Sequence, residues 1–157
     1  MSEQTGLRKV FVDANVLIAG ADSRSGASHA VLVLAEIGLF QLATCRQVLD
    51  EAERNLRKKL PRALPNFALQ MSLLPLHIVP VPSPDEVRRW AVIIEPKDAP
   101  ILAAAVSARP DRLLTLNIRD FTPQVAAATG LIIQTSGEFI QEIRSMISAG
   151  LPPSISK

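Results

Sequence analysis

Short apolar runs alternate with helix-like segments along almost the whole chain, and this alternation restricts the possible fold more than any other feature of the sequence. Strand-like runs lie at residues 8–12, 40–45, 76–81, 112–116 and 131–135. Helices are expected at residues 15–21, 28–37, 46–60, 63–74, 84–94, 99–109 and 137–149. This succession predicts one α/β domain, in which a mostly parallel sheet carries helices on both faces.

Local signals support this assignment. Residues 10–12 are continuously apolar, whereas a strand with one solvated face would alternate apolar and polar residues. Ser83 followed by Pro84 is a favourable helix start, because serine caps the first turn and proline fits its first position. Ser28 is expected to cap the helix that ends near Ile37 in the same way.

Length and composition limit the number of domains and the compartment. The chain has 157 residues, 48% of them hydrophobic, so we expect one domain over residues 1–150 and a short frayed tail over 151–157. The longest apolar run, "AVLVLAEIGLF", contains Glu36 and is too short to span a membrane, and the opening "MSEQTGLRKV" lacks the apolar segment of a signal peptide. A single cysteine, Cys45, excludes an internal disulfide and fits the reducing cytoplasm.

Charge permits nucleic-acid binding but does not by itself argue for it. The formal net charge is only +2, and aromatic residues make up 4% of the chain, with no tyrosine. Recognition dominated by bases stacked on aromatic side chains is therefore not expected. A basic stretch is a weaker candidate for RNA contact, and it contains Arg54, Arg57, Lys58, Lys59 and Arg62. The same cations could instead complement the dipole at a helix C-terminus.

Three aspartates lie where apolar segments meet polar ones. Asp13 and Asp120 follow predicted strands, and Asp98 precedes a predicted helix. Because sites in α/β sheets form outside the carboxyl ends of the strands, one sheet edge could gather these acids. Several carboxylates in one cleft require a compensating cation, and oxygen ligands suit Mg²⁺ or Mn²⁺. Such a cation facing a phosphodiester would make a water-activating nuclease site.

Each acid also has a purely structural explanation. Asp13 or Asn15 could cap the helix that follows, Asp98 could cap the next helix, and Asp120 could be a turn residue.

The helix at residues 46–60 offers a fourth acid. Its apolar stripe turns Asp50 away, while Glu51 and Glu53 flank the stripe on opposite sides. Periodicity does not choose between these two glutamates, and both could simply lie on a solvated face.

Four segments resemble those of PIN-domain nucleases, in the order that the family has them. "VFVDANVLIAG" resembles the family's opening strand and helix, and "VLDEAERNL" its helix with the second acid, which selects Glu51. "KDAPILAAA" resembles the segment with the third acid, Asp98, and "LLTLNIRDF" the strand and turn that end at Asp120. The match covers the chain from about Arg8 to Asp120. One departure is Asn117, where some members have aspartate, which leaves Asp120 as the fourth acid.

The resemblance implies a three-layer α/β/α fold and metal-dependent endonucleolytic cleavage of RNA. Asp13, Asp98 and Asp120 would bind Mg²⁺ or Mn²⁺, and Glu51 would complete the catalytic acids. Asn15, Thr115 and Asn117 would have supporting roles. The resemblance also implies either the toxin of a toxin–antitoxin pair, with an antitoxin partner and a homodimer, or a related stand-alone protein.

Other function classes have less support. A phosphatase with an aspartyl-phosphate intermediate needs a second aspartate where this chain has Asn15. The sequence contains no Gly-x-Gly-x-x-Gly after the first strand, no Gly-Lys-Ser/Thr loop and no Gly-x-Ser-x-Gly elbow. The remaining alternative is a non-catalytic PIN-like module that binds RNA or a protein.

Overall fold

The computed structural model describes residues 6–150 and is built around a five-stranded sheet. The strands are β1 Lys9–Val12, β2 Gln41–Cys45, β3 His77–Val79, β4 Arg112–Leu114 and β5 Ile133–Gln134. They are ordered β3-β2-β1-β4-β5, and each neighbouring pair is parallel. The predicted α/β class with a parallel sheet is confirmed.

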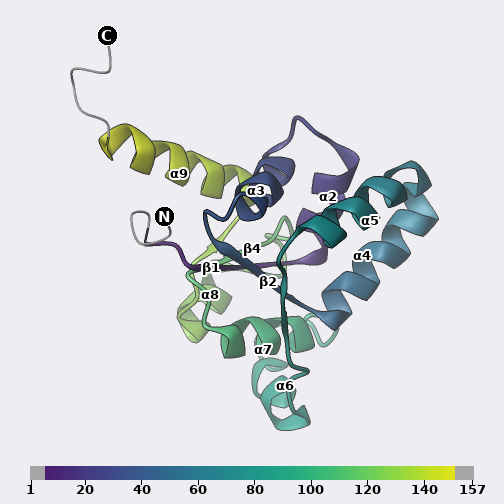
Figure 1. Ribbon diagram of the computed structural model, residues 1–157. Helices are drawn as coiled ribbons and strands as arrows, with labels where there is room; N and C mark the ends of the chain where they lie inside the picture. The colour runs from purple at the N-terminus through teal and green to yellow at the C-terminus, as the bar shows by residue number, and fades with distance from the viewer. Residues whose placement is uncertain (1–5, 151–157) are drawn as a thin grey trace.

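Helices cover both faces of the sheet, as Figure 1 shows. One side carries α2 Ala14–Asp22, α3 Ala27–Glu36, α5 Leu64–Leu73 and α9 Ser136–Gly150. The other side carries α6 Pro84–Trp90, α7 Ala99–Ala108 and α8 Pro123–Thr129. Helix α4, Arg46–Lys59, packs against α2 and α5 and reaches past the sheet, and the short 3-10 turn η1, Pro61–Ala63, joins it to α5. This is the expected three-layer α/β/α arrangement.

The middle of the sheet is sealed from water. Val10, Phe11 and Val12 of β1 are fully buried, which confirms the inference from their uninterrupted apolar run. Helix α7 is buried along most of its length because alanines dominate it and let it approach the sheet closely. Within residues 6–150, no helix is both long and apolar enough to cross a bilayer.

The strand order reverses between β1 and β4. The chain builds β1, β2 and β3 in one direction and then crosses over to β4 and β5 on the other side of β1. Such a reversal leaves a crevice outside the carboxyl ends of the two strands that flank it. The backbone N–H of Asp13 donates to the carbonyl of Leu114 at 3.0 Å, which joins the two strand ends at this point.

Two helix starts differ from expectation. The prediction that Ser28 caps α3 is wrong: Gly26 is at the N-cap, and the buried Ser28 hydroxyl donates to Ser136 at 2.8 Å. Helix α8 was not predicted, although Thr122 caps it by accepting from the Val125 N–H. Its seven residues are too few to show a helical period. The expected tail at 151–157 lies outside the described residues.

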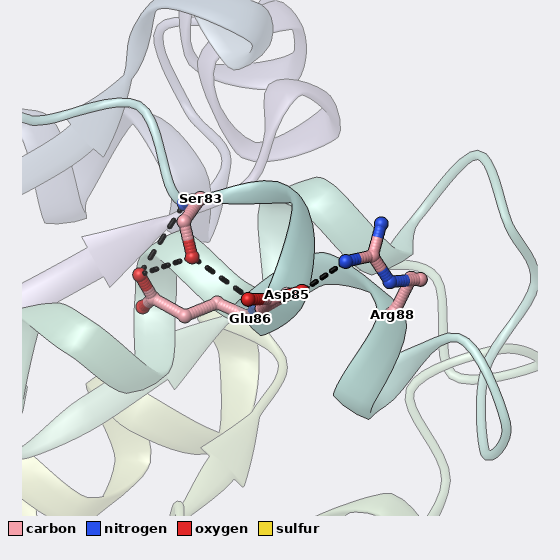
Figure 2. A network of polar contacts seen from close by, with 4 residues as sticks. All are labelled: Ser83, Asp85, Glu86 and Arg88. Carbon is pink, nitrogen blue, oxygen red and sulfur yellow. Dashed lines mark hydrogen bonds and ion pairs between the residues drawn. The ribbon is translucent and has the colours of Figure 1, made fainter.

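The start of α6 agrees with its sequence signal. The Ser83 hydroxyl accepts from the Glu86 N–H at 3.2 Å, while the Glu86 carboxylate accepts from the Ser83 N–H at 3.3 Å. Figure 2 draws these contacts. Asp85 and Arg88 form an exposed ion pair one turn further along. This reciprocal capping fixes where α6 begins.

A half-buried ion pair ties β4 to α9, and we expect Glu142→Gln to weaken the fold. Arg112 donates to both carboxylate oxygens of Glu142, at 3.0 and 2.7 Å. Arg112 lowers the pKa of Glu142, so this contribution is present above the ordinary glutamate pKa and disappears as the solution is acidified through the lowered value. The variant should lose about 1 kcal/mol of unfolding free energy at pH 7 and little at pH 3, measured by urea denaturation.

The exposed pair of Arg57 with Glu53 provides the matched control for this prediction. Glu53→Gln should change stability by less than about 0.5 kcal/mol at either pH. Equal losses for the two variants would contradict the structural role of the Arg112–Glu142 pair.

Candidate active site

Asp13 lies directly after β1 and is 4% exposed. One carboxylate oxygen accepts from the Ala14 N–H at 2.8 Å, and the other accepts from the Thr115 hydroxyl at 2.8 Å. Burial raises the pKa of Asp13, and these hydrogen bonds partly offset that rise. Asp13 therefore caps α2 with one carboxylate oxygen, which agrees with the structural explanation of this residue. The hydrogen bond from Thr115 holds its other oxygen beside the end of β4.

Asn15 and Thr115 fix the position of Asp13. Thr115 is fully buried directly after β4. The Asn15 side-chain oxygen accepts from the Leu116 N–H at 2.9 Å, and its amide nitrogen lies 3.5 Å from Asp13 and 3.4 Å from the Thr115 hydroxyl. The predicted supporting residues thus link the ends of β1 and β4.

Asn117 and Asp120 form a small closed turn after β4. The Asn117 amide donates to the Asp120 carboxylate at 3.1 Å, and its side-chain oxygen accepts from the Asp120 N–H at 3.3 Å. The Asn117 N–H in turn donates to the Thr115 hydroxyl at 3.0 Å. The bond from Asn117 is the main reason that the pKa of Asp120 is lowered. Asp120 is therefore the readily ionised acid of the group.

Asp98 is the most electrostatically perturbed acid. It is 8% exposed and immediately precedes α7, but its side chain makes no capping hydrogen bond, so the capping explanation is not supported. One of its carboxylate oxygens is buried without a partner among the described residues. Burial, the neighbouring Asp120 carboxyl group and the charge of Asp13 raise the pKa of Asp98 to about 7.

The two candidate glutamates of α4 differ in their burial and in the charges near them. Glu51 is half-buried, and burial together with the charge of Asp13 raises its pKa. Glu53 is exposed and pairs with Arg57 at 3.4 Å. Glu51 is thus the glutamate of this helix that interacts with Asp13, a distinction that helical periodicity alone left open.

The acid group has the chemistry of a divalent-cation site. Asp98 keeps a buried oxygen without a partner, and the mutual repulsion of Asp13, Glu51, Asp98 and Asp120 favours a compensating cation. Within the described part of the chain, however, no three acidic, histidine or cysteine side chains lie close enough to hold an ion as they stand. Carboxylate oxygens are the ligand type that Mg²⁺ and Mn²⁺ prefer. For three of these carboxylates to bind one ion, their side chains would have to rotate toward one another.

Lys97 belongs to this region and was not singled out from the sequence. Its charge partly offsets the raised pKa values of Glu51 and Asp98 and contributes to the lowered pKa of Asp120. The Gln47 side chain donates to the Lys97 carbonyl at 3.2 Å and so ties α4 to the segment before α7. The sequence feature that could have identified Lys97 is its position directly before the candidate acid Asp98. Lysines are common on protein surfaces, however, and nothing in the sequence distinguishes this one from the others.

The basic stretch lies on and just beyond α4. Arg57, Lys58 and Lys59 occupy the last turn of the helix, and Arg62 lies in η1. Arg54 is the member whose charge acts on Glu51.

The fold and this site together describe an α/β protein with a group of acids where its strand order reverses. A family model described as the PIN domain matches residues 9–119, which is more than two thirds of the chain. The chain belongs to the PIN-domain family. No curated protein sequence matches it.

A solved structure supports the same fold. The chain is similar to a chain in the crystal structure of VapBC2 from Rickettsia felis bound to a DNA fragment from the promoter. The two are 16% identical, with a TM-score of 0.58, and the match covers 81% of this chain and 98% of the other.

Proposed function

We propose that this protein is a metal-dependent endoribonuclease that hydrolyses RNA phosphodiester bonds. The observation that carries the proposal is the group of four acids at the strand reversal, in which Asp98 keeps a buried oxygen without a partner. Membership of the PIN-domain family supports the same activity. Asp13, Asp98 and Asp120 are the residues that would hold Mg²⁺ or Mn²⁺.

The surroundings of each residue suggest its role in the proposed reaction. A divalent cation bound by the acids would stabilise charge on the phosphate and lower the pKa of a water. Thr115 and the Ala14 N–H orient the Asp13 carboxylate, and Asn117 does the same for Asp120. Glu51, whose pKa is raised, would take the proton of the attacking water.

A toxin role in a toxin–antitoxin pair is the finer part of the proposal. The similarity to a chain of VapBC2 supports a protein antitoxin as the partner. The family resemblance implies a homodimer, and the single cysteine fits the reducing cytoplasm. Co-expression with the product of a neighbouring small gene, followed by size-exclusion chromatography, tests the partner. If the chain elutes with the same mass in the presence and absence of that product, this role is wrong.

The alternative is a PIN-like module that binds RNA or protein without cleaving. It is favoured by one observation, that within residues 6–150 no three metal-binding side chains approach closely enough to share an ion. A labelled RNA incubated with Mg²⁺ or Mn²⁺, with and without EDTA, separates the two candidates. Cleavage that EDTA abolishes supports the nuclease, whereas binding without cleavage in either metal supports the module.

If the basic stretch contacts RNA, we expect the Lys58→Ala, Lys59→Ala double variant to bind with a weaker salt dependence. Both lysines are exposed at the end of α4. Losing two phosphate contacts should reduce the slope of log K against log salt by about 1.4 for single-stranded RNA, measured by fluorescence anisotropy.

The control removes two exposed arginines elsewhere in the chain, Arg24 in the connection between α2 and α3 and Arg144 on α9. This control should leave the slope unchanged. An unchanged slope in the lysine variant would mean that these cations only complement the helix C-terminus.

A further inference from the structure

Lys97 belongs to a short turn whose backbone is fixed from two sides. The turn runs from Glu95 to Asp98, and the Asp98 N–H donates to the Glu95 carbonyl at 2.9 Å. Pro96 occupies the second position of this turn, where the fixed φ of proline is favourable. The Gln47 side chain donates to the Lys97 carbonyl at 3.2 Å and so ties the turn to the first residues of α4. The backbone of Lys97 is therefore held in place directly beside Asp98.

The charge of Lys97 reaches acids that come from three different segments. It acts on Glu51 of α4, on Asp98 before α7 and on Asp120 after β4. Interactions between charges become weak over short distances in solvent, because water and salt screen them. The Lys97 ammonium therefore lies near all three carboxylates.

The other cations near the acids act more locally. The charge of Arg54 acts on Glu51, and that of Arg119 acts on Asp120. Neither arginine is shared by three acids in the way that Lys97 is. Lys97 is thus the best-placed cation for a ligand that contacts several of these acids at once.

The Lys97 ammonium is not held by any of these acids. Its side chain is exposed, and the ion pairs formed within residues 6–150 do not include it. An ammonium in an ion pair would have to leave its partner before it could contact a ligand. Lys97 has three donors on a flexible stem, so it remains available to a ligand that arrives at the acids.

A phosphate is the ligand that such a cation fits. The phosphodiester of the proposed substrate carries a negative charge, and the carboxylates of the site repel it. A positive charge beside the acids that is not paired with them weakens this repulsion. A lysine ammonium suits that position, because it contacts a phosphate oxygen as a compact point charge.

We propose that the Lys97 ammonium contacts a non-bridging oxygen of the RNA phosphodiester that lies at the acids, so that Lys97 is a substrate-binding residue of the site. This inference rests on the proposed ribonuclease function. The contact comes from the same turn as Asp98, and it is separate from the basic stretch on α4 and η1.

The test measures RNA binding by variants of the whole chain in Mg²⁺. A fluorescein-labelled single-stranded RNA is titrated with protein carrying Asp13→Asn, so that cleavage does not deplete the probe, and Lys97→Met is then added. Methionine keeps an unbranched stem and removes the charge, whereas Lys97→Arg keeps a positive charge and tests for rescue. The matched control is Arg144→Met, since Arg144 is an exposed cation on α9.

We expect Lys97→Met to weaken RNA binding about three- to tenfold. It should also reduce the slope of log K against log salt by about 0.7, the value for one phosphate contact on a single strand. Lys97→Arg should restore most of the affinity, and Arg144→Met should leave it unchanged. An unchanged affinity and slope in Lys97→Met would overturn the proposal, as would an equal loss in Lys97→Arg or in the Arg144 control.

Thermal unfolding distinguishes this contact from a role confined to the acids. If Lys97 only offset the repulsion between carboxylates, Lys97→Met would change the Tm of the RNA-free chain, or its rise on addition of Mg²⁺, without changing RNA affinity. That combination would contradict the proposed contact. If Lys97→Met does not fold, Lys97→Gln provides the same comparison with a polar side chain.

Cleavage by the parent chain separates this inference from the proposed function. If the parent cleaves RNA in Mg²⁺ and adding Lys97→Met leaves RNA binding unchanged, only the inference about Lys97 fails. If the parent neither binds nor cleaves RNA, the proposed function fails with it.

Discussion

Asp13→Asn is expected to abolish metal-dependent RNA cleavage and leave the fold intact. The asparagine keeps an oxygen for the Ala14 N–H, so the cap of α2 persists, but it removes the buried charge that a cation needs. Loss of a direct ligand should exceed the 10- to 100-fold effect typical of residues that only orient ligands, so we expect cleavage to fall by more than about a hundredfold. Initial rates on labelled RNA in Mg²⁺ and Mn²⁺ measure this.

Asp50→Asn is the matched control, because Asp50 is an exposed acid next to Glu51 and lies away from the acid group. Its cleavage rate should stay within about twofold of the parent. Far-UV circular dichroism and thermal unfolding check that both variants are folded. A folded Asp13→Asn protein that cleaves as fast as the parent would overturn the assignment of the site.

Asp98→Asn is expected to stabilise the protein while it also stops cleavage. The pKa of Asp98 is raised to about 7, so the folded chain holds this proton more tightly than the unfolded chain does. The parent therefore loses stability as the pH rises from about 4 to about 7 and does not regain it above that range. Replacing the carboxylate should add about 1–3 kcal/mol at pH 8, which corresponds to a rise of roughly 2–12 °C in Tm.

Scanning calorimetry at pH 5 and pH 8 measures the effect, because the stabilisation should be much smaller at pH 5. The change in Tm on addition of Mg²⁺ is a second measurement. A cation that binds only the folded state raises Tm, so the parent should gain stability with Mg²⁺ and Asp98→Asn should gain little. A variant that is less stable than the parent at pH 8 would show that the Asp98 charge is not the unfavourable interaction inferred here.

Much of the fold followed from local pattern. The five strands and most helices appeared near their predicted positions because each has a strong apolar run or a clear start signal, as Ser83 and Pro84 do for α6. Failures occurred where local signals were short or ambiguous. Ser28 resembles a cap in sequence, but its hydroxyl is used by Ser136, 108 residues away.

The candidate site was only partly visible in the sequence. Asp13, Asp98 and Asp120 stood out because each lies where an apolar segment meets a polar one, and the motif order linked them to one family. Lys97 did not stand out, because its interaction with three acids depends on how α4, α7 and the turn after β4 meet.

The sequence by itself determined the α/β class and singled out the acids that are proposed for the candidate site. Those properties are encoded in apolar periodicity and in short motifs, which are local. Only the tertiary structure decided the strand order, the burial of Glu51 near the charge of Asp13 and the raised pKa of Asp98. Each of these depends on burial and on charges contributed by other segments, because neither solvent exclusion nor a through-space interaction can be read from neighbours along the chain.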